Sequence, residues 1–268
     1  MATLVFIGGG NMASAILGGL IASGTPAASV LVVEPFEAQR ERLRKDFGVA
    51  TLGAADASIA SAEMVVWAVK PQLFASAAAP CAAHVGDALH LSVMAGIRSE
   101  TLLRTLATER IVRAMPNTPA LIGQGIAGLY ARAAVRPDER ERVERLFAPT
   151  GRTLWVAREE DLDAVTALSG SGPAYVFYVI EAMVEAAVCM GLSAEQGKAR
   201  ALATLAGATA LAQASADPPA LLRERVTSKG GTTDAALRTL EAGHVKATFI
   251  AAIQAAQRRA QTLGDEFG

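Results

Sequence analysis

Residues 4–13 read LVFIGGGNMA, an apolar strand pattern that runs into three glycines and then into a helix-forming segment. Gly8, Gly10 and Ala13 have the spacing G-x-G-x-x-A. In this pattern the first small residue permits a tight turn, the second lets the backbone approach a pyrophosphate, and the third keeps helix and strand close. The N-terminus of the helix offers unpaired N–H groups and a positive dipole end to the phosphates. We therefore predict a dinucleotide-binding turn.

Three further strand ends supply predicted cofactor contacts. The strand at residues 30–33 ends at Glu34, whose carboxylate is placed to accept hydrogen bonds from the adenosine ribose and to repel a 2′-phosphate. Arg40, Arg42 and Arg44 follow and could instead approach such a phosphate, so the choice between NADH and NADPH stays open. The predicted cofactor-binding residues are Ile7, Gly8, Gly9, Gly10, Asn11, Met12 and Glu34, then Ala68, Val69, Lys70 and Pro71, and finally Val93, Met94 and Ala95.

The first half of the chain alternates short apolar segments with helix-forming segments, which is typical of a parallel sheet covered on both faces. Strands are predicted at residues 4–7, 30–33, 64–68, 89–93, 111–114, 125–130 and 151–156, and helices at 12–22, 37–47, 71–82, 100–107 and 137–147. The predicted fold class is α/β. We expect a Rossmann-type doubly wound sheet that forms a dinucleotide-binding domain over residues 1–157.

Residues 158–268 are almost entirely helix-forming. Helices are predicted at 161–168, 173–190, 194–214, 218–226, 232–241 and 245–263. Their alanine-rich faces offer more apolar surface than a small bundle can bury, which favours self-association. The apolar stretch 173–192 approaches the length of a membrane span, but Glu181 and Glu185 would be costly in lipid. We predict a helical C-terminal domain for substrate binding and dimerisation, with this stretch buried against a partner subunit.

The overall composition describes a folded protein with no electrostatic reason to bind nucleic acid or membrane. Of its 268 residues 51% are hydrophobic and 19% charged, and the formal net charge is −1. The first residues lack the basic region of a signal peptide, so a cytoplasmic location is expected. Cys81 and Cys189 lie far apart in apolar surroundings, and we expect two buried free thiols.

The sequence contains no obvious acid or base for catalysis. His84, His90 and His244 have no partners at metal or triad spacing, so we interpret all three as structural and predict no metal site. Reduction of an imine fits this absence, because the substrate nitrogen can bind already protonated. The protein then has only to hold the iminium carbon against a nicotinamide and form one hydrogen bond at nitrogen.

A glycine-containing loop between two predicted helices is the candidate substrate site. Residues 226–233 read VTSKGGTT, and two adjacent glycines allow close backbone approach beside a helix N-terminus. Such a nest of N–H groups suits a small carboxylate. An ordinary helix N-cap would have the same residue types, so this pattern alone leaves both interpretations open. The predicted catalytic residues are Thr233 and Ser228, and the predicted substrate-binding residues are Gly230, Gly231, Thr232 and Thr233.

Six segments together resemble the pyrroline-5-carboxylate reductase family, in family order and over nearly the whole chain. They are FIGGGNMA at residues 6–13, WAVKPQ at 67–72, RAMPNTPA at 113–120, LSGSGPAY at 168–175, MGL at 190–192 and LLRERVTSKGGTTDAALRTLE at 221–241. The last is the most specific. The resemblance implies hydride transfer from NAD(P)H to the C=N bond of 1-pyrroline-5-carboxylate, giving L-proline. NADPH (NADP) is the cofactor that the resemblance favours, with NADH (NAD) possible.

The resemblance also implies how a site is assembled. Thr233 would hydrogen-bond the ring nitrogen, while Ser228 and the backbone of residues 230–233 hold the carboxylate. Interlocked helical domains would form a dimer, or a larger assembly such as a decamer, and each site would combine one subunit's cofactor with the other's Thr233. Residues 115–119 and 169–173 would line the cleft near the nicotinamide.

Two positions depart from the family pattern, and two other functions compete. Glu34 stands where a small polar or basic residue is common, and Ala55 where an asparagine is common; both bear on the choice of cofactor rather than on the reaction. A β-hydroxyacid-type dehydrogenase is the nearest alternative enzyme, with Lys229 as its acid/base. A non-catalytic dinucleotide sensor is the alternative of another class, although it would not need the intact glycine loop.

Overall fold

The computed structural model describes residues 3–267, and the chain divides into two compact units. The first unit contains the chain up to Ser171 together with the C-terminal segment from Ala256, and the second is Gly172–Ala255. This division differs from the domain boundary expected between residues 157 and 158. Helix α6 (Asp161–Val165) packs on a strand of the first unit, and the end of the last helix returns to that unit.

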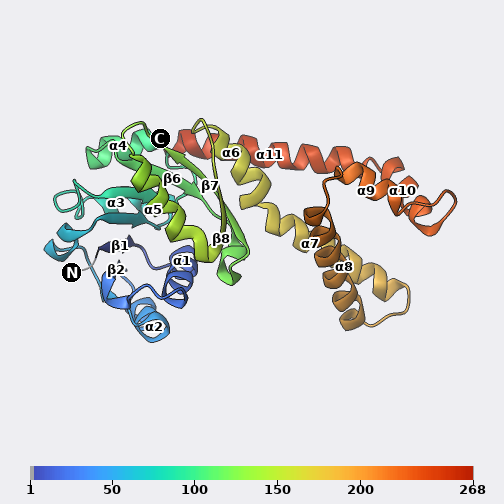
Figure 1. The fold of residues 1–268 in the computed structure, drawn as a ribbon, viewed down its shortest axis with the longest axis horizontal. Coiled ribbons are helices and arrows are strands. Elements are labelled where there is room, and N and C mark those ends of the chain that lie inside the picture. The colour runs from blue at the N-terminus through green and yellow to red at the C-terminus, as the bar shows by residue number, and fades with distance from the viewer. Residues whose placement is uncertain (1–2, 268) are drawn as a thin grey trace. The chain divides into compact units, whose positions relative to one another are not determined.

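The first unit is built on an eight-stranded, mostly parallel sheet with the order β3-β2-β1-β4-β5-β6-β7-β8 (Figure 1). The strands are β1 (Leu4–Ile7), β2 (Val30–Val33), β3 (Ala50–Leu52), β4 (Met64–Trp67), β5 (Leu89–Ser92), β6 (Ile111–Met115), β7 (Gly125–Ala131) and β8 (Gly151–Trp155). Strands β1 to β6 run parallel, β7 is antiparallel to β6, and β8 is parallel to β7. The strand order reverses beside β1, and ligands bind at such a switch point in open α/β sheets.

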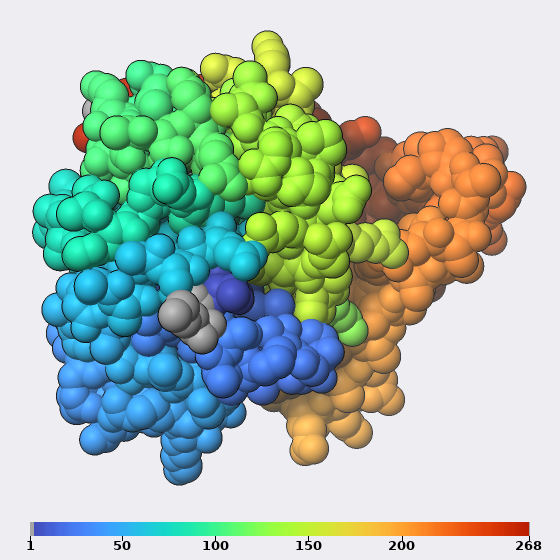
Figure 2. All heavy atoms as spheres, turned by 60° about the vertical axis from the view of Figure 1, so that its left-hand side comes forward, coloured from blue at the N-terminus to red at the C-terminus, as the bar shows by residue number. Residues whose placement is uncertain are grey.

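Helices cover both faces of this sheet, as predicted. They are α1 (Asn11–Ala22), α2 (Glu37–Phe47), α3 (Phe74–Ala78), α4 (Ser99–Leu106) and α5 (Pro137–Phe147). Alternate strand residues enter two separate apolar cores: Phe6 packs in the core with α1, α2 and α5, whereas Val5 and Ile7 pack in the core with α3 and α4. The segments coloured blue to yellow-green, which carry the sheet and these helices, form one continuous body (Figure 2).

Most predicted elements are confirmed within a few residues, with three differences. Strand β3 was not predicted, because a three-residue edge strand shows no periodicity of its own. The helix predicted at 71–82 is a 3₁₀ turn (Pro71–Leu73) followed by the short α3, which ends two residues before Pro80. The helix predicted at 161–168 is α6 followed by a π-helix at Thr166–Gly170.

The second unit is helical and leaves much apolar surface uncovered. Its helices are α7 (Gly172–Cys189), α8 (Ala194–Ala214), α9 (Pro219–Arg225), α10 (Thr232–Ala242) and the first half of α11 (Val245–Glu266). Helices α7 and α8 approach closely at Gly197, where an added Cβ would lie 2.8 Å from the Cβ of Ala187. On α7, Phe177 is 59% exposed and Tyr178 73% exposed. An apolar face of this kind fits a surface that a second chain covers.

Helix α7 belongs to a long apolar helical stretch. Among residues 3–267, one helical stretch, Asp161–Cys189, is long and apolar enough to cross a membrane by length and composition, a test that the core helix of a soluble protein also passes.

The expectation of two buried thiols holds for Cys81 only. Cys189 is exposed, because it closes a helix that the single chain leaves largely uncovered. Burial raises the pKa of the Cys81 thiol to about 11.

His90 lies inside the sheet and has a structural role. It is fully buried on β5, where its Nδ1 accepts the indole N–H of Trp67 at 3.0 Å and its Nε2 lies 3.1 Å from the carbonyl oxygen of Val85. The two bonds fix the neutral tautomer with the proton on Nε2. Burial lowers the pKa of His90 to about 4, against an ordinary value of 6.5.

We predict that His90 makes the fold sensitive to acid. Because its folded pKa is depressed, the unfolded chain binds the extra proton first. The stabilisation is therefore complete above pH 6.5 and is lost as the pH falls toward about 4. The loss should reach about 3 kcal/mol in the free energy of unfolding, measured by urea denaturation over this range. In His90→Gln the free energy of unfolding should depend less on pH. An equally steep pH dependence in this variant would show that His90 is not its source.

Candidate dinucleotide and substrate sites

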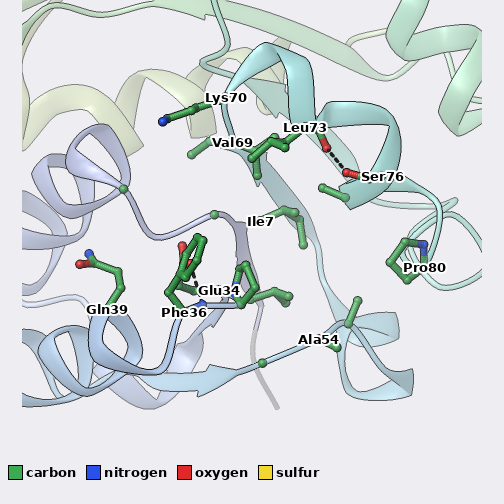
Figure 3. Close-up of a pocket in the computed structure, with 18 of the residues that line it drawn as sticks. Ile7, Glu34, Phe36, Gln39, Ala54, Val69, Lys70, Leu73, Ser76 and Pro80 are labelled. Carbon is green, nitrogen blue, oxygen red and sulfur yellow. Dashed lines mark hydrogen bonds between the residues drawn. The ribbon is translucent and has the colours of Figure 1, made fainter.

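A cavity of about 1010 Å³ opens at the carboxyl ends of β1, β2 and β4. Figure 3 shows Val69, Lys70 and Leu73 along one side of it, with Glu34 and Phe36 along the other. The predicted cofactor residues that line it are Ile7, Gly8, Gly10, Glu34, Ala68, Val69 and Lys70. The structure therefore brings together the glycine turn and both of the neighbouring strand ends.

The glycine turn is held tightly on its inner side and is open on its outer side. The Gly8 N–H donates to the carbonyl oxygen of Val33 at 2.8 Å, and the Ala68 N–H donates to that of Ile7 at 2.8 Å. Gly8 has a φ of +97°, and an added Cβ would lie 2.7 Å from the Ala68 carbonyl oxygen. At Gly10, by contrast, an added Cβ would meet nothing within 4 Å.

This geometry fits a dinucleotide pyrophosphate. Gly10 is the N-cap of α1 and has no side chain to occupy the N–H groups of the first helical turn. Those donors and the positive end of the helix dipole face the open space beside Gly10, where a phosphate can approach the backbone. The residues present can therefore hold the dinucleotide that the sequence motif predicts.

Glu34 is bound to the glycine turn itself. Its Oε2 accepts the Gly9 N–H at 2.8 Å and its Oε1 accepts the Phe36 N–H at 3.1 Å, and the residue is 7% exposed. Gln39 donates from Nε2 to the Gly9 carbonyl oxygen at 2.5 Å. The side chain predicted to face the ribose thus also fixes the turn that receives the phosphates.

Several predicted cofactor residues do not line the cavity: Gly9, Asn11, Met12, Pro71, Val93, Met94 and Ala95. Met94 is buried in the core under α3 and α4. Their contact with a cofactor stays a prediction. Conversely, the cavity is lined by residues that sequence reasoning did not select, among them Phe36, Gln39, Leu73, Ser76 and Pro80. Phe36 closely follows the end of β2 and could have been selected by that position, since the carboxyl ends of adjacent parallel strands share one edge of the sheet, whereas Ser76 and Pro80 lie farther along the chain and gave no such signal.

The second predicted site is the loop between α9 and α10. Gly230 has a φ of +76°, and its N–H donates to Oδ2 of Asp234 at 2.9 Å. Gly231 is the N-cap of α10 and, like Gly10, supplies no capping side chain. Arg238 pairs with the same Asp234 oxygen at 3.0 Å, which offsets the negative charge in the first turn. Backbone N–H groups at this terminus remain suited to a small carboxylate.

The other members of this predicted site lie close by in the chain. Ser228 is exposed and accepts the Gly231 N–H on its carbonyl oxygen at 2.9 Å. Thr232 and Thr233 are the first two residues of α10, and Thr233 is partly buried. A cavity of about 510 Å³ between α9 and α10 is lined by Thr227 and Asp234 but not by residues 228–233. The catalytic roles of Ser228 and Thr233 stay predictions.

The two segments expected beside the nicotinamide are joined by one side chain. Asn117 donates from Nδ2 to the Ser169 carbonyl oxygen at 3.1 Å and accepts the Ile126 N–H on Oδ1 at 3.0 Å. Ser169 belongs to the π-helix, a distortion that occurs frequently at functional sites. Among residues 3–267, no group of three or more His, Cys, Asp or Glu side chains is arranged to hold a metal ion.

The sheet topology, the glycine turn and the cavity beside it define a dinucleotide-binding protein of the Rossmann class. Two family descriptions match the chain. "NADP oxidoreductase coenzyme F420-dependent" covers residues 3–96, and "Pyrroline-5-carboxylate reductase dimerisation" covers residues 159–263.

Curated relatives match over the full length. The chain is 40% identical to pyrroline-5-carboxylate reductase of Pseudomonas aeruginosa, covering 99% of this chain and 98% of the relative. It is 37% identical to the enzyme of that name from Synechocystis, covering 97% and 98%. The chain belongs to the pyrroline-5-carboxylate reductase family.

Solved structures agree with this assignment. A pyrroline-5-carboxylate reductase from Coxiella burnetii superposes with a TM-score of 0.90 at 35% identity, over 98% of both chains. The Plasmodium falciparum pyrroline carboxylate reductase, solved with NADP bound, superposes with a TM-score of 0.88 at 28% identity, again over 98% of both.

Two glycine substitutions should separate folding from dinucleotide binding. Gly10→Ala places its Cβ in open space, so the melting temperature should stay close to that of the wild type. The affinity for NADH should fall about tenfold or more, because the methyl group keeps phosphate from the backbone. Gly8→Ala should instead cost roughly 1–3 kcal/mol of stability through its positive φ and its contact with Ala68. Thermal melts and NADH fluorescence titration measure both effects; equal affinity in Gly10→Ala would contradict this position for the pyrophosphate.

Proposed function

We propose that this protein is an NAD(P)H-dependent pyrroline-5-carboxylate reductase, which reduces the C=N bond of 1-pyrroline-5-carboxylate to give L-proline. The observation that carries this proposal is identity of up to 40% to curated enzymes of that name over almost the whole chain. The glycine N-caps of α1 and α10 support the proposal, because each leaves first-turn N–H groups without a capping side chain.

The substrate carboxylate is held at the N-terminus of α10. Gly230 and Gly231 let a small anion approach the backbone, and the first-turn N–H groups of Thr232 and Thr233 point toward it. The hydroxyl of Ser228 adds a directional hydrogen bond at the edge of the nest. Binding through backbone donors fixes the orientation of the ring without placing a cation beside the reacting carbon.

Thr233 contacts the ring nitrogen through its hydroxyl. A five-membered cyclic imine places its nitrogen within a few bonds of the carboxylate, so one residue at the start of α10 can address the nitrogen while the backbone holds the acid. Bound NAD(P)H supplies the hydride. Because the imine nitrogen binds already protonated, the chain provides position and one hydrogen bond rather than a strong acid.

The remaining features of the molecule fit this enzyme. Residues 1–157 bind the cofactor and residues 158–268 carry the substrate loop and the dimer contacts, with the exposed apolar face of α7 covered by a second copy. The interlocked dimer, or a larger assembly such as a decamer, brings one subunit's cofactor to the other's Thr233. We place the enzyme in the cytoplasm, with neither nucleic acid nor membrane as a partner.

The direct test follows absorbance at 340 nm while the purified protein meets 1-pyrroline-5-carboxylate with NADPH or with NADH. Oxidation of either cofactor with formation of proline is the expected result. A folded protein that binds dinucleotide but oxidises neither cofactor in the presence of the imine would refute the proposed function. Activity on a 3-hydroxy acid that disappears in Lys229→Ala would point to the dehydrogenase instead.

Thr233→Ala should reduce kcat/KM about 10- to 150-fold, because a hydrogen bond to a polar or charged ring nitrogen contributes roughly 1.5–3 kcal/mol. The matched control is Thr239→Ala on the same helix, whose hydroxyl donates to the Ala235 carbonyl oxygen within α10. The control should retain wild-type kcat/KM. Equal rates in wild type and Thr233→Ala would remove Thr233 from the site.

A further inference from the structure

The carboxylate of Glu34 is fixed in the wall of the dinucleotide cavity. Both oxygens are used, one by the Gly9 N–H and one by the Phe36 N–H, so the side chain cannot turn away without leaving a buried backbone donor unpaired. The residue lines the cavity at the carboxyl end of β2. In Rossmann folds an acid at this position lies beside the 2′ position of the adenosine ribose.

A 2′-phosphate brings up to two negative charges to this position and requires cations there. Arg40 is not available, because its Nη1 donates to the carbonyl oxygens of Glu34 and Pro35, both at 2.7 Å, and its Nη2 pairs with Glu37. Its side chain is only 14% exposed. Arg40, the cation closest in sequence to the end of β2, therefore stabilises the backbone of the loop and does not face the cavity.

The other two arginines of α2 offer little compensation. Arg44 pairs with Glu37 at 2.7 Å and donates to Oγ1 of Thr51 at 2.8 Å. The hydrogen bonds from Arg44 and Arg40 hold the pKa of Glu37 below its ordinary value, so this carboxylate stays charged and keeps both arginines engaged. Arg42 lines the cavity, but its side chain is 70% exposed and lies 3.4 Å from Asp46. Because Arg42 is exposed and paired with Asp46, solvent screens its attraction for a phosphate and the Asp46 carboxylate offsets it.

We propose that Glu34 makes this enzyme selective for NADH over NADPH, by accepting the ribose hydroxyls and repelling a 2′-phosphate from a fixed position. This inference rests on the proposed function only in that both require dinucleotide in the cavity. It reverses the preference for NADPH that the family resemblance implies. The reason is local: in this chain the charge at the end of β2 is negative and the neighbouring guanidinium of Arg40 is turned away.

The test measures the dissociation constants of NADH and NADPH directly, by nucleotide fluorescence with no imine present. In the wild type NADH should bind about tenfold or more tightly than NADPH. Glu34→Gln keeps an oxygen that can accept the Gly9 N–H but removes the charge. The dissociation constant of NADPH divided by that of NADH should therefore fall by roughly ten- to a hundredfold. Glu41→Gln, the same change at an exposed position of α2, should leave the ratio unaltered.

Salt provides a second measurement that needs no variant. Because the repulsion between Glu34 and a 2′-phosphate is electrostatic, raising the ionic strength should bring the dissociation constants of NADPH and NADH closer together in the wild type. Wild-type protein that binds NADPH as tightly as NADH would overturn the proposal, as would a ratio that Glu34→Gln leaves unchanged. Selective NADH binding without imine reduction would refute the proposed reaction and leave the selectivity standing. Imine reduction by a protein that binds NADPH more tightly than NADH would support the proposed reaction and refute the selectivity.

Discussion

The close contact between the glycine turn and the ends of β2 and β4 is the constraint on which the first unit depends. Gly8 can occupy its position only without a side chain, since the Ala68 carbonyl lies where a Cβ would be. Bonds from Gly8 to Val33 and from Ala68 to Ile7 extend both neighbouring strand pairings into the turn. The same three strand ends then form the cavity. The contacts that join β1, β2 and β4 at the point where the strand order reverses therefore also create the binding site.

A buried ionic cluster fixes the segment that leaves the sheet. Glu159 accepts the Ser99 N–H at 2.6 Å and pairs with Arg113 at 2.6 Å, while Arg98 pairs with Asp163 at 3.0 Å. Burial alone would raise the pKa of Glu159, but Arg113 and the Ser99 hydrogen bonds lower it, so it remains a charged acceptor. Removal of one member would leave an uncompensated buried charge. This cluster therefore ties α6 and the segment before it to β6 and to the start of α4.

Both candidate sites use the same physical device. Helices α1 and α10 each begin at a glycine that supplies no capping side chain, Gly10 and Gly231, so first-turn N–H groups stay available to an anion. Elsewhere in the chain Ser193 and Gln196 form a capping box that occupies such donors at the start of α8. Helices α2, α4 and α9 also begin without a side-chain cap, so the missing cap at α1 and α10 fits an anion site but does not by itself mark one.

The sequence by itself determined seven of the strands, the glycine turn and the loop before α10, because these depend on residue spacing within a few positions. It could not predict the three-residue β3, the antiparallel direction of β7 or the exposure of Cys189, which depend on partners distant in the chain. It placed Glu34 at the ribose end of the cavity but left its effect open against the arginines that follow. Only the tertiary structure showed that Glu34 binds Gly9 and that Arg40 turns to backbone carbonyls. The direction of a charged side chain is set by which donors and acceptors the folded chain brings within reach, and no local pattern contains that information.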